Sequence, residues 1–172
     1  IVDDSADDRL LLQSILSAAG YDQLLVAGSA AAAFRLLGLD DGKHSAASRV
    51  DLILMAIVMP EMSGIEACRQ IKALLPETHI LFLTSYADNR FVLAAMEAGA
   101  DGYLLKDDSR LEMLTGVRAV LNGKSFLSPA ICERVVNGYL GGGIGSSGRT
   151  RPAGTQSSIG AEVLSQRERE VI

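Results

Sequence analysis

The sequence predicts an α/β protein with a five-stranded parallel sheet, in the strand order 2-1-3-4-5, and with helices on both faces. Short apolar runs alternate along the chain with segments of helical periodicity, which is the pattern of consecutive strand–helix–strand units. The connections in such units place helices over both faces of a parallel sheet. The strand order is the one that open sheets of this kind commonly adopt around a single switch point.

The first part of the chain contains two predicted strands and two predicted helices. Ile1-Val2 reads as the end of a strand, and because a typical strand has about 5–6 residues, we expect its upstream part to be missing from this sequence. Residues 9–19 carry apolar side chains three and four positions apart, which predicts a helix. A strand is predicted at 24–27 and an alanine-rich helix at 29–38. The polar residues 40–49 indicate a loop.

The middle of the chain continues this alternation. Two of its helices have a start signal, because Ser63-x-x-Glu66 and Ser109-x-x-Glu112 both fit a capping box. In that motif the serine oxygen accepts a hydrogen bond from an otherwise unpaired amide of the first turn. The predicted strands are 52–55, 80–83 and 103–105, and the predicted helices are 64–75, 89–98 and 110–121.

A sixth helical segment and a polar tract follow. Pro at the first helical position makes Ser128-Pro129 a good helix entry, and an apolar stripe continues to Leu140. The next twenty residues are rich in Gly, Ser and Thr, which predicts a flexible linker. The predicted parts are an α/β domain at 1–122, a connecting amphipathic helix at 123–140, a linker at 141–161 and the start of a further, truncated domain at 162–172.

Composition sets broad limits on function. The net charge of −5 argues against a nucleic-acid-binding surface on this chain. No apolar run approaches the ~20 residues of a membrane helix, and there is no signal peptide, so we expect a cytoplasmic protein without a membrane partner. Cys68 and Cys132 share no ligand-like spacing with each other or with His44 and His79, which predicts two reduced cysteines.

Polar residues collect where the predicted strands end, which is where open parallel sheets bind their ligands. Asp3 and Asp4 follow the first strand, Thr84 follows the fourth and Lys106 follows the fifth. Two adjacent carboxylates are suited to Mg²⁺, while a hydroxyl and an ammonium group are suited to phosphoryl oxygens. These groups serve phosphoryl transfer by positioning and electrostatics, but the third strand ends in Ala56, which has no group that accepts a phosphoryl.

Each of these residues has an ordinary interpretation on its own. An Asp-Asp pair is usually a solvated turn, a threonine at a strand end favours the strand, and a lysine there is a surface charge. Their common placement at strand ends is what favours a site.

The sequence resembles the receiver domain of bacterial two-component response regulators, which has a flavodoxin-like fold. The resemblance covers about residues 1–122, and it rests on "IVDD" (1–4), "DLILMAIVMPEMSG" (51–64), "LTS" (83–85) and "GYLLKD" (102–107).

The resemblance implies a role for each matching residue. Asp4 would bind Mg²⁺ directly, Asp3 would act on the metal through water, and the backbone carbonyl of Val58 would be a further ligand. Thr84 and Lys106 would bind the phosphoryl group. Tyr103, three residues before Lys106, would be the aromatic switch that moves with Thr84; its other interpretation is an ordinary strand residue.

Ala56 departs from the family pattern, which has the phospho-accepting Asp at this position. One interpretation is a substitution introduced to prevent phosphorylation. The other is a natural pseudo-receiver that acts as a phosphorylation-independent interaction module. We favour the introduced substitution, because every other site position is kept. In both cases Mg²⁺ binding should be weakened, and the receiver's own phosphotransfer from a histidine kinase, its only expected catalysis, should be abolished.

The C-terminal part resembles a subfamily of these regulators. Residues 122–136 resemble the junction after the receiver in NarL/FixJ-type proteins, and residues 164–172 resemble the opening helix of a LuxR-type helix-turn-helix domain. The implied protein is a bacterial transcription regulator. Its implied partners are a cognate sensor histidine kinase, DNA in the full-length parent only, and a second copy of the chain in a receiver homodimer.

One enzymatic alternative shares part of this chemistry. Phosphatases of the haloacid dehalogenase type also combine strand-end Asp residues, Mg²⁺, a Thr or Ser and a Lys. They need an Asp-x-Asp pair after the first strand, and Asp3-Asp4-Ser5 does not supply that spacing.

Overall fold

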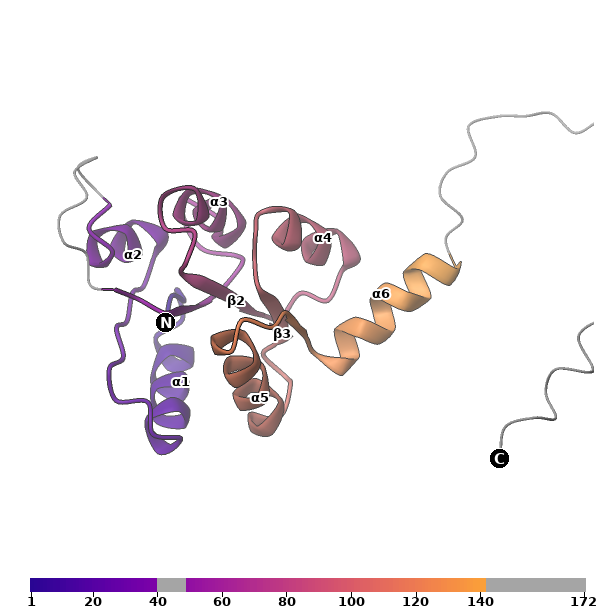
Figure 1. Ribbon diagram of the computed structural model, residues 1–172, viewed down its shortest axis with the longest axis horizontal. Coiled ribbons are helices and arrows are strands. Elements are labelled where there is room, and N and C mark those ends of the chain that lie inside the picture. The colour runs from indigo at the N-terminus through magenta and orange to yellow at the C-terminus, as the bar shows by residue number, and fades with distance from the viewer. Residues whose placement is uncertain (40–48, 142–172) are drawn as a thin grey trace, which may run out of the picture. The chain divides into compact units, whose positions relative to one another are not determined.

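The computed structural model describes residues 1–39 and 49–141. Within these ranges a parallel sheet lies between two layers of helices (Figure 1). Helices α1 and α5 cover one face, and α2, α3 and α4 cover the other. The helices are α1 (Ala6–Ala18), α2 (Ala30–Leu36), α3 (Gly64–Leu74), α4 (Asn89–Glu97), α5 (Arg110–Leu121) and α6 (Pro129–Gly141).

The sheet has the predicted order. Its named strands are β1 (Leu52–Met55), β2 (His79–Thr84), β3 (Gly102–Leu105) and β4 (Phe126–Leu127), all parallel and adjacent in that order. Val2 bridges Met55 on one side and Ala27 on the other, which places the first predicted strand between the second and the third. The sequence of strands is therefore 2-1-3-4-5 with β4 added beyond the fifth.

The second predicted strand, 24–27, is shorter than expected, whereas Val2 pairs on both sides as the first predicted strand should. Residues 24–27 contribute one bridge, between Ala27 and Val2. The hydrogen bonds between the two segments are Ile1 N to the carbonyl of Leu25, Ala27 N to the carbonyl of Ile1, and Asp3 N to the carbonyl of Ala27.

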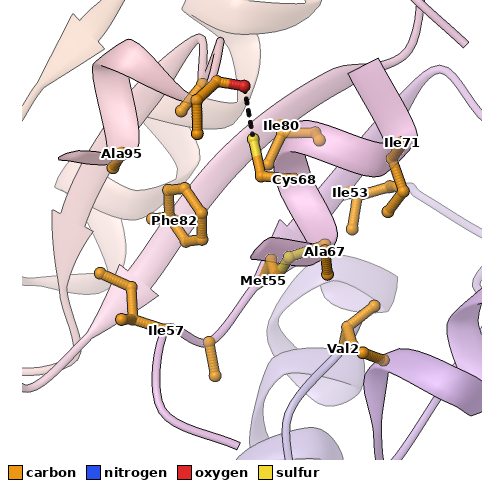
Figure 2. Close-up of a cluster of buried hydrophobic side chains, with 14 of the residues drawn as sticks. Val2, Ile53, Met55, Ile57, Ala67, Cys68, Ile71, Ile80, Phe82 and Ala95 are labelled. Carbon is orange, nitrogen blue, oxygen red and sulfur yellow. Dashed lines mark hydrogen bonds between the residues drawn. The ribbon is translucent and has the colours of Figure 1, made fainter. Parts of the chain in front are cut away.

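Alternating residues of the strands form two cores. One, shown in Figure 2, joins the sheet to α2, α3 and α4, and Ile53, Met55, Ile80 and Phe82 point into it. The other joins the intervening strand residues to α1 and α5, and its members are Leu12, Leu16, Leu54, Leu81, Leu83, Leu104, Met113, Val117 and Val120. Both faces of the sheet are therefore buried, as a parallel sheet requires.

The helix start signals are confirmed to different degrees. Ser109 and Glu112 form the complete reciprocal capping box. Ser63 accepts from the amide of Glu66, but the Glu66 side chain bonds Gln70 instead of returning to Ser63.

The additional C-terminal helix is confirmed and packs on the sheet domain. Helix α6 lies against α4 and β3 beyond the last strand (Figure 1). Ile131 is fully buried in the core that contains Tyr103, and the side-chain amide of Asn89 donates to the carbonyl of Arg134 at 3.3 Å. The predicted linker at 141–161, the segment 162–172 and most of the predicted loop 40–49 lie outside the described residues.

Both cysteines are free thiols, with Cys68 buried and Cys132 exposed. In the part of the chain that the structure describes, no helix has the length and apolar character needed to cross a membrane.

Candidate functional site

The sheet brings the predicted site residues together at the carboxyl ends of its strands. The amide of Ala56 donates to the carbonyl of Val2 at 2.8 Å, so Asp3 and Ala56 leave neighbouring strands side by side. The amide of Lys106 donates to the carbonyl of Thr84 at 2.8 Å, which joins the next two strand ends in the same way. The contiguous edge that the sequence predicts is thus present.

Two carboxylates hold the ammonium group of Lys106. Its Nζ lies 2.7 Å from Oδ2 of Asp3 and 2.6 Å from Oδ2 of Asp8. The Asp3 side chain is 2% exposed and that of Lys106 is 23% exposed, so these charges are largely withdrawn from water. Asp3 is further fixed because its Oδ1 accepts from the amide of Ser5 at 2.9 Å.

Sequence reasoning missed Asp8, which lies in the first turn of α1. From the sequence alone, Asp8 is an acidic residue near the start of a helix, where a negative charge interacts favourably with the helix dipole. Ser5 caps that helix by accepting from the amide of Asp8. The contact with Lys106 joins residues 98 positions apart, so no local pattern reveals it.

These contacts shift the pKa values of Lys106 and Asp8. Partial burial acts to lower the pKa of Lys106, but hydrogen bonds to Asp3 and Asp8 outweigh it and raise that pKa. The pKa of Asp8 is lowered, chiefly by its hydrogen bond to Lys106. The ammonium and carboxylate forms therefore stabilise one another.

Arg9 fixes the backbone of the acidic turn and was also missed. Its Nη1 donates to the carbonyl of Asp3 at 2.7 Å and to that of Asp4 at 3.0 Å. Asp4 itself is exposed at the end of its strand. The guanidinium thus holds both carbonyls, and the carboxylate of Asp4 faces solvent.

Ala56 is buried at the centre of the strand ends, with 5% of its surface exposed. The first residue of α3, Gly64, packs directly over it. A Cβ at Gly64 would stand 2.0 Å from the carbonyl oxygen of Ala56, so this close approach requires glycine. The amide of Gly64 donates to the carbonyl of Ile57 at 2.7 Å, and the loop between them carries Val58, a residue that is 50% exposed.

The predicted metal ligands form an incomplete set. Among residues 1–39 and 49–141, no group of three or more His, Cys, Asp or Glu side chains could hold a metal ion. Asp3, Asp4 and the Val58 carbonyl are oxygen donors of the kind that Mg²⁺ takes with additional waters. This chemistry fits a weak Mg²⁺ site, since residue 56 adds no carboxylate and Asp3 already contacts Lys106.

Thr84 and Tyr103 meet on the backbone of one residue, Tyr86. Thr84 is 2% exposed, and its hydroxyl oxygen accepts from the amide of Tyr86 at 3.3 Å. The Tyr103 hydroxyl donates to the carbonyl of Tyr86 at 2.6 Å, and its ring is fully buried near Phe82. Burial raises the pKa of the Tyr103 phenol, which keeps it a hydrogen-bond donor. The two predicted switch residues are thus linked through a shared loop.

Parallel strand ends with this set of acidic, hydroxyl and lysine side chains are the architecture of a receiver domain. A family model described as the response regulator receiver domain matches residues 1–118. The chain belongs to this family. That assignment leaves the haloacid dehalogenase alternative without support.

Curated relatives and solved structures agree with the family. The chain is 39% identical to the response regulator protein VraR of Staphylococcus aureus over 87 residues, which are 51% of this chain and 42% of VraR. The match therefore spans less than half the length of that relative. A LuxR-family two-component response regulator from Aurantimonas sp. SI85-9A1 has 28% identity, a TM-score of 0.71 and coverage of 81% of this chain and 94% of the solved one.

A second solved structure is the receiver domain of the putative response regulator NarL from Mycobacterium tuberculosis. It has 26% identity, a TM-score of 0.62 and coverage of 72% of this chain and 94% of that one. The chain is therefore a receiver domain of a two-component system, with relatives of the LuxR type.

Proposed function

We propose that this receiver belongs to a response regulator that controls transcription, and that Ala56 makes the chain unable to accept a phosphoryl group. The observation that carries the proposal is the buried alanine at the junction of Asp3, Thr84 and Lys106. The side chains that a phosphoryl site would need around an acceptor, those of Asp3, Thr84 and Lys106, lie at neighbouring strand ends, and residue 56 offers no group that could form the covalent bond.

The chemistry shows what Ala56 removes. With a carboxylate at residue 56, one of its oxygens would attack the phosphorus of a donor, the bond from phosphorus to the donor's leaving group would break, and an acyl phosphate would form. Mg²⁺, when bound, would neutralise phosphoryl charge. Thr84 and Lys106 would donate to the phosphoryl oxygens. A methyl group supplies no electron pair, so the chain catalyses no phosphotransfer to itself.

The proposed output runs through Thr84 and Tyr103. Both side chains form hydrogen bonds with the backbone of Tyr86. A movement of Thr84 would therefore shift the Tyr86 backbone and change the hydrogen bond of Tyr103. Helix α6 packs on the same strand as Tyr103 and leads into residues that resemble a LuxR-type domain. We propose a sensor histidine kinase as the upstream partner, and dimerisation or DNA binding in the longer protein as the output.

The second candidate is a natural pseudo-receiver that binds a protein partner without phosphorylation. One observation favours it. Lys106 already has two carboxylate partners, so the loss of a third at residue 56 leaves no unpaired ammonium in this site. The residue encoded at position 56 in the natural gene separates the two candidates.

The test is phosphorylation of a single revertant. The unsubstituted chain, incubated with acetyl phosphate and Mg²⁺, should form no acid-stable, base-labile phosphoprotein, whereas Ala56→Asp should form one. Ala56→Asn is the matched control, since its side chain has nearly the same shape but is not a carboxylate. Mg²⁺ titration should show tighter binding by Ala56→Asp than by either other protein.

Two outcomes contradict the proposal. Uptake of base-labile phosphate by the unsubstituted chain would place the acceptor elsewhere. Failure of folded Ala56→Asp to take up phosphate would mean that the strand-end residues do not form a phosphoryl site.

A further inference from the structure

We propose that Asp8 is a positioning residue, which holds the ammonium group of Lys106 against α1 and competes for it with any carboxylate or phosphoryl group at residue 56. The inference rests on the proposed function, because it assigns Asp8 a role in the same phosphoryl site. Asp8 should therefore slow the phosphorylation of a carboxylate placed at residue 56.

The ammonium group of Lys106 contacts two carboxylates. Lys106 Nζ lies 2.6 Å from Asp8 and 2.7 Å from Asp3. An ammonium group has three donors. One of them donates to Asp8, and Asp3 forms an ion pair with the same group. Charge-assisted hydrogen bonds of this length are stronger than neutral ones. Lys106 is therefore engaged before any phosphoryl group arrives.

Hydrogen bonds fix the first turn of α1, which carries Asp8. Ser5 caps the helix through the amide of Asp8, and Arg9 bonds the carbonyls of Asp3 and Asp4. Asp8 is thus carried by a turn that is held on both sides. Its side chain is 37% exposed and that of Lys106 is 23% exposed, so the pair is only partly screened by water.

The charged groups around Lys106 carry a net negative charge. Two carboxylates and one ammonium leave a single net negative charge among Asp3, Asp8 and Lys106. A carboxylate at residue 56 would add a second negative charge, close to where an anionic phosphodonor must approach. Replacing Asp8 by its amide would return the charge to that of the present chain and free one ammonium donor.

The position next to Asp8 offers a matched control. Asp7 lies in the same first turn of α1 and is exposed. Within the described part of the chain its side chain makes no hydrogen bond or ion pair. Asp7→Asn therefore removes the same charge from the same helix without touching Lys106.

The experiment compares phosphorylation rates in the Ala56→Asp background, with acetyl phosphate and Mg²⁺. Adding Asp8→Asn should raise the rate about fivefold, which corresponds to the upper end of the range for a partly exposed ion pair. Adding Asp7→Asn should leave the rate unchanged, and adding Asp8→Glu, which restores the charge, should return the rate toward that of Ala56→Asp alone. Circular dichroism melting confirms that each variant is folded.

A second readout needs no phosphoryl transfer. In the Ala56 chain, Lys106 is acylated with an amine-reactive ester, and peptide mass spectrometry compares it with the exposed Lys124 as internal reference. Asp8→Asn should raise the reactivity of Lys106 relative to Lys124 about fivefold, by the same ion-pair range. Asp7→Asn should not raise it.

Each outcome decides the inference. If Ala56→Asp is phosphorylated and Asp8→Asn leaves its rate unchanged, the role of Asp8 is wrong and the proposed function stands. If no variant is phosphorylated, the proposed function fails, and the acylation of Lys106 alone decides whether Asp8 holds it. Equal acylation in Asp8→Asn and Asp7→Asn would overturn the inference.

Discussion

Asp101 is the residue whose replacement tests the folding of this domain most directly. It lies between α4 and β3, and its carboxylate contacts three groups at the end of the sheet opposite the candidate site. Lys72 Nζ lies 2.7 Å away, His79 Nδ1 lies 3.1 Å away, and the amide of Ile80 donates at 2.8 Å. One side chain therefore ties α3, β2 and the start of β3 together.

The loss of stability in Asp101→Ala depends on which polar groups remain without a partner. In Asp101→Ala, Lys72 and His79 can turn to water, but the amide of the fully buried Ile80 loses its acceptor. An unpaired buried amide costs about 1–3 kcal/mol, and a lost hydrogen bond to a charged group about 1.5–3 kcal/mol. We expect a loss of about 3 kcal/mol in the free energy of unfolding. Asp101→Asn keeps an acceptor for Ile80, so it should lose about half as much.

The same contacts set the pH dependence. Burial acts to raise the pKa of Asp101, but its hydrogen bonds to Lys72, the Ile80 amide and His79 outweigh it, so the pKa is lowered. A lowered pKa in the folded state gives stability that is present above the unfolded pKa of about 3.9 and is lost as the pH falls through the folded pKa. The stability difference between the original chain and Asp101→Asn should therefore shrink in acid.

Urea unfolding followed by far-UV circular dichroism measures both effects, at about pH 6 and about pH 3, which bracket the unfolded pKa. For a chain of this length, 3 kcal/mol corresponds to a fall in Tm of about 6–12 °C. The control is Asp51→Asn, because that carboxylate is 71% exposed and 3.7 Å from Arg49. Equal midpoints for the Asp101 and Asp51 variants, or a difference that does not change with pH, would refute this reasoning.

Two further predictions concern residues beside the site. Gly64→Ala should destabilise the fold by about 1–3 kcal/mol, because its Cβ would collide with the carbonyl of Ala56. Gly28→Ala is its control, since the added Cβ would lie 3.4 Å from the guanidinium of Arg9, which is an ordinary van der Waals distance. Equal urea midpoints for the two variants would disprove the clash. Tyr103→Phe should lower stability by about 1 kcal/mol, because the carbonyl of Tyr86 loses its buried donor. An unchanged urea midpoint would show that this hydroxyl does not stabilise the loop.

Much of the architecture follows from local pattern. Apolar runs with helical segments between them predict β1, β2, β3 and helices α1 to α5, and the Ser128-Pro129 entry predicts α6. The weak points are the strands that depend on a distant partner. Residues 24–27 are apolar enough for a strand but have few residues to pair with, and β4 has only two residues, too few for a pattern.

The sequence likewise predicts some residues of the candidate site and misses others. Asp3, Asp4, Ala56, Thr84 and Lys106 are found from the sequence because each directly follows an apolar run, and the ends of parallel strands share one edge. Their roles in binding Mg²⁺ and a phosphoryl group stay predictions. Asp8, Arg9 and Asp108 lie on helices or loops and carry no comparable signal. Asp108 is the acceptor for the amide of Leu105 at 2.8 Å, just before Lys106.

The sequence by itself determined the helices, most of the strands, the edge where the site lies, and the absence of a carboxylate at residue 56. Periodicity and strand-end position are local properties, so they can be read along the chain. Only the tertiary structure decided that Lys106 is held by Asp3 and Asp8, and that Thr84 and Tyr103 meet at Tyr86. The contacts of Lys106 with Asp3 and Asp8, and that of Tyr103 with Tyr86, join segments far apart in the chain. They exist because α1 packs on the sheet and β3 pairs within it, which brings these groups within hydrogen-bond distance.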